Sequence, residues 1–218
     1  MSKPITVLIA DDHEMFAGSL ASWLRGAPDI GVVEVVDNSE AAVRQAVAGR
    51  PDVVLLDIDM PGLPCFDAAR IITQHCPNCA ILFVSAHTHD HYIERALAVE
   101  AAGYVTKTEP PQSVLDAIRA AVSGGAYFSP EVQSRIIVDA EGARLAEPVR
   151  TRLSLLTPRE LDTLRYLARG MSKKRVAEKL GISVKTVETH TANLMDKLGI
   201  HNRVELALFA VREGLANA

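Results

Sequence analysis

Five polar side chains in the first half of the chain each follow a short apolar segment, and together they could bind a metal ion and accept a phosphoryl group. They are the acidic pair Asp11 and Asp12, a third carboxylate, Asp57, the hydroxyl of Ser85 and the amine of Lys107. The apolar segments before them are residues 7–10, 53–56, 80–84 and 103–106. If these segments are parallel strands, the polar side chains meet at one edge of the sheet.

The carboxylates in this set indicate a divalent cation. Clustered carboxylates repel one another, so a cation usually neutralises them, and Mg²⁺ prefers oxygen ligands and retained waters. A carboxylate that faces a bound metal can attack phosphorus and become an acyl phosphate. Lys107 and Ser85 can then serve the new phosphoryl oxygens by charge and by hydrogen bonding. A single aspartate after a strand is more often a turn or cap residue, so the interpretation depends on the whole set.

The segments between these residues predict how they are positioned. Helix-period segments cover residues 15–24, 41–47, 68–72, 93–99 and 114–122. Strands rich in Val, Ile and Leu that alternate with helices predict a parallel sheet covered on both faces. Five such units fit within 123 residues, so we expect a five-stranded, doubly wound α/β sheet of flavodoxin-like type.

Across residues 5–123 the chain resembles the receiver domain of bacterial two-component response regulators. The matching stretches are residues 9–13 (IADDH), 55–62 (LLDIDMPG), 84–86 (VSA) and 103–107 (GYVTK). The resemblance implies that Asp57 accepts a phosphoryl group from a sensor histidine kinase in a Mg²⁺-dependent reaction. It also implies that Asp12, Asp57 and the Asp59 carbonyl group ligate Mg²⁺, and that Asp11 orients a metal-bound water.

The same resemblance implies a switch. Ser85 would move toward the phosphoryl oxygen, Tyr104 would turn inward, and the surface of the fourth helix, fifth strand and fifth helix would be remodelled. In physical terms, the charge added by phosphorylation shifts the equilibrium between two conformations of this surface. His87 lies two residues after Ser85, and we hypothesise that His87 and Asp59 set the lifetime of the phosphoryl group.

Histidines and cysteines also gather near the predicted fourth strand. His87, His89 and His91 alternate after the strand, and Cys76 and Cys79 precede it. Structural zinc sites normally assemble four ligands, and the sequence has no second cysteine pair. We therefore expect a polar loop that caps the fourth helix, although a metal site remains an alternative.

Charge divides the chain into two domains. Residues 1–124 carry 8 Lys and Arg against 16 Asp and Glu, whereas residues 154–218 carry 11 against 7. A basic C-terminal region suggests that a nucleic-acid contact is confined to it. There is no stretch of about 18 apolar residues and no apolar leader, so we expect a cytoplasmic protein without a membrane partner.

We expect domain boundaries at residues 1–123, 124–152 and 153–218. We interpret the middle segment as a linker with a short helix over residues 130–138. In the last segment, Thr157 and Glu160 form a capping box with Pro158 between them, which predicts a helix over residues 158–169. Ser172 and Ser183 cap two further helices, and the turn between these contains glycine, which is the helix-turn-helix signature.

The third of these helices, residues 184–198, presents polar side chains that suit base edges and phosphates. The candidate DNA-contacting residues are Lys173, Lys174, Lys185, Thr186, Glu188, Thr189, Asn193 and Lys197. Lysines would neutralise phosphates without reading sequence. Spacing and charge alone leave open a small helical dimerisation or protein-binding module.

Residues 154–213 resemble the LuxR-type helix-turn-helix of the NarL/FixJ response regulators. The matching stretches are residues 156–160 (LTPRE), 176–177 (VA), 180–183 (LGIS), 185–190 (KTVETH) and 197–199 (KLG). The resemblance implies an all-α domain of four helices, whose third helix enters the major groove. It implies that a fourth helix, residues 202–213, helps to pair two such domains.

The two resemblances in this order indicate a transcription factor controlled by phosphorylation. Its partners would be a sensor histidine kinase, double-stranded DNA and, when phosphorylated, a second copy of itself. It would not be an enzyme beyond its own phosphorylation and dephosphorylation. Two alternatives are a phosphorylation-independent transcription factor with a partner-controlled receiver, and a metal-dependent phosphohydrolase that uses Asp57 as a transient acceptor.

Overall fold

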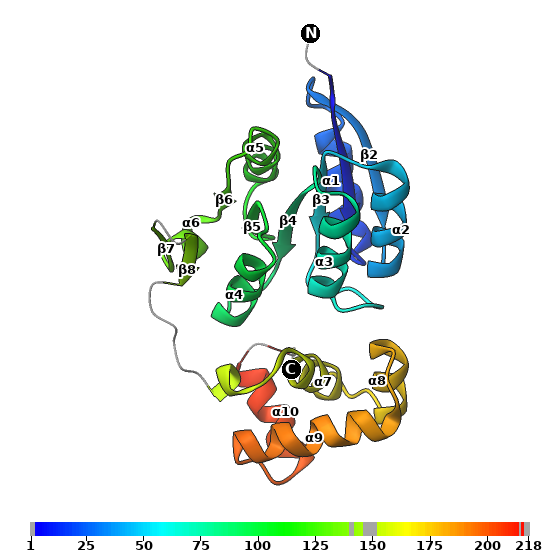
Figure 1. Cartoon of the computed structure of the whole chain (residues 1–218), viewed down its shortest axis with the longest axis vertical. Helices are drawn as coiled ribbons and strands as arrows, with labels where there is room; N and C mark the ends of the chain where they lie inside the picture. Colours follow the sequence, from blue (N-terminus) through cyan, green and yellow to red (C-terminus); the bar gives the residue numbers. More distant parts are fainter. Residues whose placement is uncertain (1–2, 140–141, 146–151, 214, 216–218) are drawn as a thin grey trace. The chain divides into compact units, whose positions relative to one another are not determined.

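The computed structural model describes residues 3–139, 142–145, 152–213 and 215. The chain forms two compact units, residues 1–147 and residues 148–218. Strands and helices alternate in the first unit, which also includes residues 124–147 of the segment expected as a linker, and helices alone form the second (Figure 1).

The first unit is a parallel sheet of strand order β2-β1-β3-β4-β5-β6. Its strands are β1 (Ile5–Ala10), β2 (Ile30–Val36), β3 (Val53–Leu56), β4 (Ala80–Ser85), β5 (Gly103–Thr106) and β6 (Tyr127–Phe128). Its main helices are α1 (Glu14–Leu24), α2 (Ser39–Gly49), α3 (Cys65–His75), α4 (Asp90–Ala98) and α5 (Pro111–Val122). The predicted parallel α/β fold is therefore confirmed, with a sixth strand that the sequence did not suggest.

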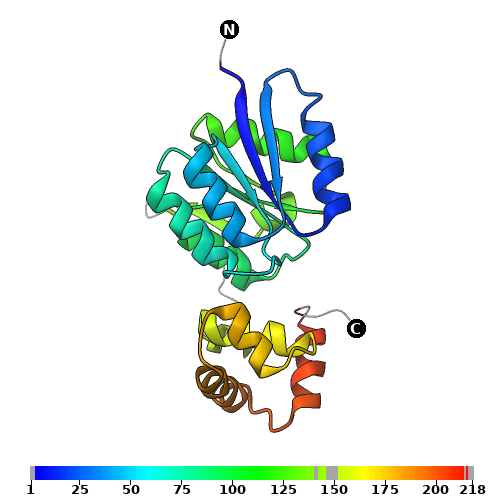
Figure 2. The ribbon, with the colours of Figure 1, turned by 90° about the vertical axis from the view of Figure 1, so that its right-hand side faces the viewer.

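Helices cover both faces of this sheet (Figures 1 and 2). On one face, α1 and α5 pack against alternate residues of β1, such as Val7 and Ile9. On the other face, aromatic rings join the elements: the Phe66 and Phe83 ring centroids are 4.8 Å apart, and those of Phe83 and Tyr104 are 6.4 Å apart. Because both faces of the central strands are buried, β1, β3, β4 and β5 are mostly apolar, whereas the edge strand β2 carries the exposed Glu34.

The segment after α5 is part of the first unit and adds β6 to its sheet. After β6 come a short helix, α6 (Pro130–Gln133), and an antiparallel pair, β7 (Ile136–Asp139) and β8 (Gly142–Leu145). The helix expected over residues 130–138 is thus wrong beyond Gln133, because the β-branched run that begins at Ile136 pairs as a strand. Gly103 permits β6 to pair, since a β-carbon there would collide with the Tyr127 carbonyl oxygen.

Arg135 fastens this segment to the loop between β4 and α4. Its Nη1 donates to the Thr88 carbonyl oxygen at 2.6 Å and to Asp90 Oδ1 at 3.1 Å. Ser129 Oγ accepts a hydrogen bond from the Thr106 amide at 2.9 Å, at the end of β5. The segment that the sequence suggested as a linker is thus tied, over its described part, to the strand ends that carry the polar residues.

The second unit is helical, as expected. It contains a short 3₁₀ helix, η1 (Arg152–Leu155), and the helices α7 (Pro158–Ala168), α8 (Lys173–Leu180), α9 (Val184–Leu198) and α10 (Arg203–Arg212). Side chains of Thr157, Ser172, Ser183 and Asn202 cap the four helices. The predicted capping box between Thr157 and Glu160 is confirmed. On α9, Val187, Leu194 and Leu198 form the buried side of the helix.

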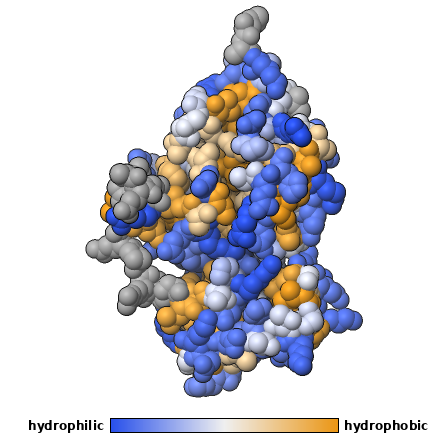
Figure 3. All heavy atoms as spheres, viewed as in Figure 1, coloured by the Kyte–Doolittle hydropathy of each residue, from blue (hydrophilic) through white to orange (hydrophobic). Residues whose placement is uncertain are grey.

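Hydrophilic side chains cover most of the surface of each unit in the view of Figure 3, with smaller hydrophobic groups among them. On α10, Val204, Leu208 and Val211 are 69%, 54% and 36% exposed. Their spacing places them along one side of the helix. Among the described residues, no helix is long and apolar enough to cross a membrane.

Candidate functional site

The three carboxylates of the predicted site lie where β1 and β3 end. Asp11 and Asp57 are 3% and 2% exposed, and Asp12 lies beside them at the surface. The register of the sheet fixes their position, because the Asp57 amide donates to the Ala10 carbonyl oxygen at 2.9 Å. Strand ends that are neighbours in the sheet therefore bring together side chains about 45 residues apart in the sequence.

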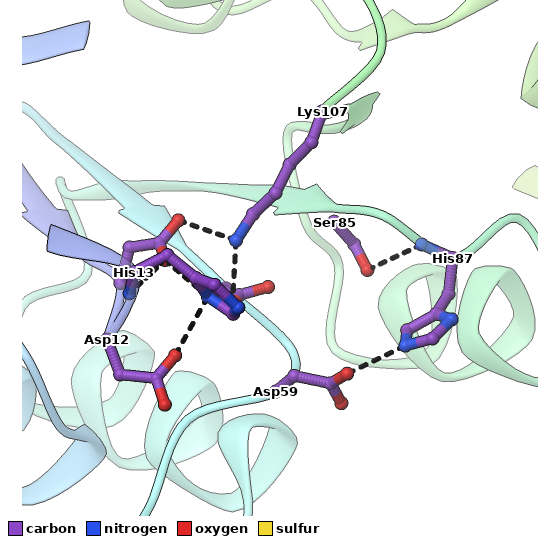
Figure 4. A network of polar contacts seen from close by, with 8 residues as sticks. Asp12, His13, Asp59, Ser85, His87 and Lys107 are labelled. Carbon is purple, nitrogen blue, oxygen red and sulfur yellow. Dashed lines mark hydrogen bonds and ion pairs between the residues drawn. The ribbon is translucent and has the colours of Figure 1, made fainter. Parts of the chain in front are cut away.

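Lys107 joins these carboxylates from the end of β5 (Figure 4). Its Nζ lies 2.7 Å from Asp11 Oδ2 and 3.0 Å from Asp57 Oδ2. The ammonium group is mostly buried and also lies 4.9 Å from the centroid of the Phe16 ring. A single cation thus bridges two buried carboxylates.

The electrostatics of Asp57 are unfavourable for its charged form. Burial raises the pKa of Asp57, the Lys107 charge offsets part of this rise, and the charge of Asp11 adds to it. The net pKa lies above the ordinary value. A second cation beside Asp57 would offset this unfavourable charge.

His13 belongs to the same cluster, although the sequence did not single it out. Its Nδ1 lies 3.0 Å from Asp12 Oδ1, 3.2 Å from Asp11 Oδ1 and 3.9 Å from Asp57 Oδ2. The one signal in the sequence was its place directly after the acidic pair. Within the described residues, Asp11, Asp12, His13 and Asp57 are the only group of potential metal ligands of this kind, and their ligand atoms lie within 4.8 Å of one another.

The donor chemistry of this cluster fits a divalent cation. Three carboxylates supply the oxygen ligands that Mg²⁺ prefers, and the two buried ones share one lysine charge between them. The Asp59 backbone belongs to the loop after β3, two residues beyond Asp57. The residues present are therefore suitable for the Mg²⁺ ion that the sequence suggested.

Ser85, His87, Asp59 and Tyr104 form a second group beside the carboxylates (Figure 4 labels the first three). His87 Nε2 lies 2.7 Å from Asp59 Oδ2, and the His87 amide donates to Ser85 Oγ at 3.1 Å. The fully buried Tyr104 donates its hydroxyl proton to the His87 carbonyl oxygen at 2.6 Å, and burial raises the pKa of Tyr104. The structure thus joins the predicted lifetime pair, Asp59 and His87, to the predicted switch pair, Ser85 and Tyr104.

His87, His89 and His91 belong to no group of potential metal ligands found among the described residues. The ring centroids of His87 and His89 are 6.1 Å apart, and the His91 ring lies 3.9 Å from the Tyr92 ring. Burial lowers the pKa of His91 to about 3, so this ring is neutral. His89 occupies the N-cap position of α4 without a side-chain capping bond, so the expected polar cap is wrong. The His89 ring instead stacks between those of His87 and His91, and all three rings lie tilted against Tyr92.

The cysteines of the loop before β4 are buried free thiols. Cys76 Sγ donates to the Ala46 carbonyl oxygen at 3.3 Å. Burial raises the pKa of Cys79 to about 12, so its thiol stays protonated. These side chains pack in the core and lie apart from the carboxylate cluster.

In the second unit, the predicted DNA-contacting residues lie on α8 and α9. Those that are exposed are Lys173, Lys174, Lys185, Glu188, Thr189, Asn193 and Lys197, while Thr186 is half-buried. Two hydroxyls are engaged locally: Thr189 Oγ1 donates to the Lys185 carbonyl oxygen at 3.1 Å, and Thr186 Oγ1 lies 2.8 Å from Ser183 Oγ.

Two of the lysines are engaged in ion pairs. Lys173 Nζ lies 3.5 Å from Glu188 Oε1, and both side chains are about half-exposed. Lys197 Nζ lies 2.7 Å from Oε2 of the buried Glu160, the capping-box residue of α7. Lys197 therefore ties α9 to α7, a role that the sequence pattern did not reveal.

Both halves of the chain match known families. The family described as response regulator receiver domain matches residues 7–119, and the luxR family of bacterial regulatory proteins matches residues 154–210. The chain is 33% identical to the transcriptional regulatory protein LiaR of Bacillus subtilis over 98% of this chain and 100% of that protein. It is 32% identical to the response regulator UvrY of Escherichia coli K12 over 98% and 97% of the two chains.

A comparison with solved structures also finds a response regulator. A structure of the RcsB response regulator of Salmonella typhimurium superposes with a TM-score of 0.73, covers 97% of this chain and 98% of its own, and is 25% identical. The similarity therefore spans both units and the segment between them.

Proposed function

Since the chain belongs to the NarL/FixJ family of response regulators and is a transcription regulator with a receiver domain and a LuxR-type DNA-binding domain, we propose that phosphorylation of Asp57 controls its binding to DNA. The observation that carries this proposal is the buried Asp57 carboxylate, 3.0 Å from Lys107 and crowded by Asp11. We assign phosphoryl acceptance to residues 1–123, the link to residues 124–152 and DNA binding to residues 153–218. We propose a cytoplasmic location, because DNA and the kinase domain would both be met there.

In the proposed reaction, a carboxylate oxygen of Asp57 attacks the phosphorus of a phosphohistidine on a sensor kinase. The new O–P bond forms as the P–N bond breaks, and the imidazole leaves with the electron pair. Asp12, Asp57 and the Asp59 carbonyl oxygen would hold Mg²⁺, with Asp11 orienting one of its waters. Mg²⁺ bound there supplies the positive charge that draws the anionic phosphoryl group toward three carboxylates.

After transfer, Lys107 and Ser85 serve the phosphoryl oxygens. Lys107 Nζ already lies beside the acceptor atom, and Ser85 Oγ is the nearest hydroxyl of the β4 end. A change at Ser85 reaches His87 through the bond between Ser85 Oγ and the His87 amide. Tyr104 holds the same loop by its bond to the His87 carbonyl oxygen, so the position of the loop is coupled to α4 and β5.

The Asp59–His87 pair supports a role in the lifetime of the phosphoryl group. The pair closes one side of the site, with the two side chains only 14% and 17% exposed. Such a pair can limit the approach of water to the acyl phosphate. We expect the double variant Asp59→Ala/His87→Ala to change the half-life of the acyl phosphate several-fold, and an unchanged half-life would show that the pair has no such role.

For DNA binding, α9 would enter the major groove, with Lys174 and Lys185 among the residues that contact phosphates. We exclude Lys197 from these contacts because its ammonium group neutralises the buried Glu160. The exposed apolar stripe of α10, Val204, Leu208 and Val211, supports pairing of two such domains. A symmetric dimer would bind half-sites about one helical turn apart.

Operator selection with and without a small phosphodonor tests the proposal. Wild-type protein and Asp57→Asn are each used to select sequences from a random DNA library, in the presence or absence of Mg²⁺. We expect donor-stimulated, Mg²⁺-dependent enrichment by the wild type alone. Equal binding by both proteins would favour a phosphorylation-independent regulator, and catalytic turnover of an external phosphate ester would favour a phosphohydrolase.

A further inference from the structure

The geometry points to His13 as a nitrogen ligand of the receiver's metal site, one that shifts its preference from Mg²⁺ toward first-row transition-metal ions such as Mn²⁺. The inference rests on the proposed function in one respect, namely that the carboxylate cluster binds a divalent cation. It concerns a residue to which neither the sequence pattern nor the proposed reaction assigns a role.

The distances around the His13 ring suit shared coordination. Its Nδ1 lies 3.0 Å from Asp12 Oδ1 and 3.2 Å from Asp11 Oδ1, and Asp57 Oδ2 lies farther, at 3.9 Å. An octahedral ion with ligands at about 2.1 Å has neighbouring ligand atoms about 3.0 Å apart and opposite ones about 4.2 Å apart. The imidazole nitrogen therefore lies at spacings that ligands of one small cation would have.

The backbone holds His13 in this place. Its amide donates to Asp11 Oδ1 at 2.9 Å, and its carbonyl oxygen accepts the first hydrogen bond of α1, from the Ala17 amide at 3.0 Å. Although His13 is the N-cap residue of α1, its side chain makes no capping bond. The imidazole therefore has no helix-capping role, and its closest polar neighbours are the carboxylates of the cluster.

Lys107 does not contact the carboxylate oxygens that face His13. Its Nζ contacts the Oδ2 atoms of Asp11 and Asp57, whereas His13 faces the Oδ1 atoms of Asp11 and Asp12 (Figure 4). The His13 side chain is 64% exposed, so the ring can adjust without disturbing the core. A cation that enters from solvent thus meets Asp12 Oδ1 and the imidazole nitrogen on this side, while Asp11 keeps the water-orienting role assigned to it above.

The chemistry of the donor set decides which cation benefits. Mg²⁺ gains little from nitrogen, because it prefers oxygen ligands and gives up its waters reluctantly. Imidazole binds later first-row ions well, and affinity for mixed nitrogen and oxygen sites rises along the series that begins at Mn²⁺. A His13 ligand should therefore raise the affinity for first-row transition-metal ions, with Mn²⁺ as the member that gains least, and leave the affinity for Mg²⁺ nearly unchanged.

Metal titration of the full-length protein tests this. Isothermal titration calorimetry with Mg²⁺ and with Mn²⁺ is compared for wild type, His13→Ala and His13→Gln, with His75→Ala as the control for a remote histidine. We expect both His13 variants to weaken Mn²⁺ binding about tenfold and to change Mg²⁺ binding by less than about twofold. Pulsed electron paramagnetic resonance of bound Mn²⁺ should show a histidine nitrogen in wild type and His75→Ala, and none in the His13 variants.

Equal Mn²⁺ affinity in all four proteins, or no nitrogen coupling in the wild type, would overturn the inference and leave His13 as a hydrogen-bonding partner of Asp11. An Asp12→Ala variant separates this result from failure of the metal site itself. If Asp12→Ala binds both ions as well as wild type, the cluster is not the metal site, and the proposed Mg²⁺ dependence fails together with the role of His13.

Discussion

The two units each contain a buried carboxylate that faces a lysine, and the two carboxylates are shifted in opposite directions. In the first unit, Lys107 lies 3.0 Å from Asp57, and the pKa of Asp57 is raised because burial and the charge of Asp11 outweigh the lysine. In the second, Lys197 lies 2.7 Å from Glu160. Burial alone would raise the pKa of Glu160, but the bonds from Lys197 and Thr157 outweigh it, so the pKa is lowered.

The difference lies in what surrounds each pair. Glu160 accepts a bond from the Thr157 amide at 2.7 Å as well as the charge of Lys197, and no second carboxylate competes for that lysine among the contacts of the structure's described residues. Lys107, in contrast, is shared between Asp57 and Asp11. A carboxylate that serves the fold is surrounded by donors, whereas one that is available for chemistry is held in a site that disfavours its charge.

The largest expected effect is on the stability of the second unit. Glu160→Ala removes the acceptor of the Thr157 amide and the partner of Lys197, so we expect a loss of about 3 kcal/mol. Hydrogen exchange of the α7 and α9 amides in the full chain measures this loss. The matched control is Glu178→Ala on α8, where the side chain is exposed and the expected change is below about 0.5 kcal/mol. Similar losses of stability in both variants would show that Glu160 stabilises the second unit no more than an exposed glutamate does.

A smaller effect of opposite sign is expected at Asp57. Because its folded environment disfavours the charge, Asp57→Asn should stabilise the first unit by about 1 kcal/mol. Chemical denaturation followed by the fluorescence of Trp23, the one tryptophan of the chain, reports on this unit. A destabilised Asp57→Asn would mean that Lys107 stabilises Asp57 more than burial and Asp11 disfavour it.

Acid should reduce both the stabilising contribution of Glu160 and the destabilising contribution of Asp57, because each depends on a charged carboxylate. The pKa of Glu160 is lowered by folding, so its contribution is present above the unfolded value of about 4.3 and is lost as pH falls through the folded value. The pKa of Asp57 is raised, so its penalty is complete above the folded pKa and disappears as pH falls toward the unfolded value of about 3.9. Stability of Glu160→Gln and Asp57→Asn relative to wild type, measured from pH 7 down to about pH 2, should show the two trends.

The smallest stability effect is expected for the exposed pair of Lys173 and Glu188. Both side chains are about half-exposed, so Lys173→Ala should change the stability of the second unit by less than about 0.5 kcal/mol. If Lys173 contacts a phosphate, the same change should weaken DNA binding for all sequences and reduce its salt dependence. Fluorescence anisotropy with operator and unrelated DNA, at several salt concentrations, measures both. Unchanged salt dependence would place Lys173 outside the DNA contact.

The sequence predicted those site residues whose place depends on strand ends. Asp11, Asp57, Ser85 and Lys107 each follow an apolar strand, and parallel strands leave no choice about the edge at which they meet. His13 was missed because a single histidine after an acidic pair has no distinctive spacing, and only the start of α1 turns its ring toward the carboxylates.

What the sequence could not predict depends on contacts between distant segments. Lys197 lies on the exposed side of α9, and its pairing with Glu160 follows from the packing of α7 on α9. The strand β7 was taken for a helix because a short apolar run fits either period, and only its partner β8 and the Arg135 bonds to the loop after β4 select the strand.

The central claim is that the strained Asp57 carboxylate is the phosphoryl acceptor, and intact-mass and peptide mass spectrometry test it most directly. The full-length protein is incubated with a small phosphodonor and Mg²⁺, beside Asp57→Asn and beside wild type with a chelator. We predict one phosphoryl group on the wild type, mapped to the peptide that contains Asp57, and none on the other two samples. A phosphoryl group on Asp57→Asn, or none on the wild type, would contradict the account.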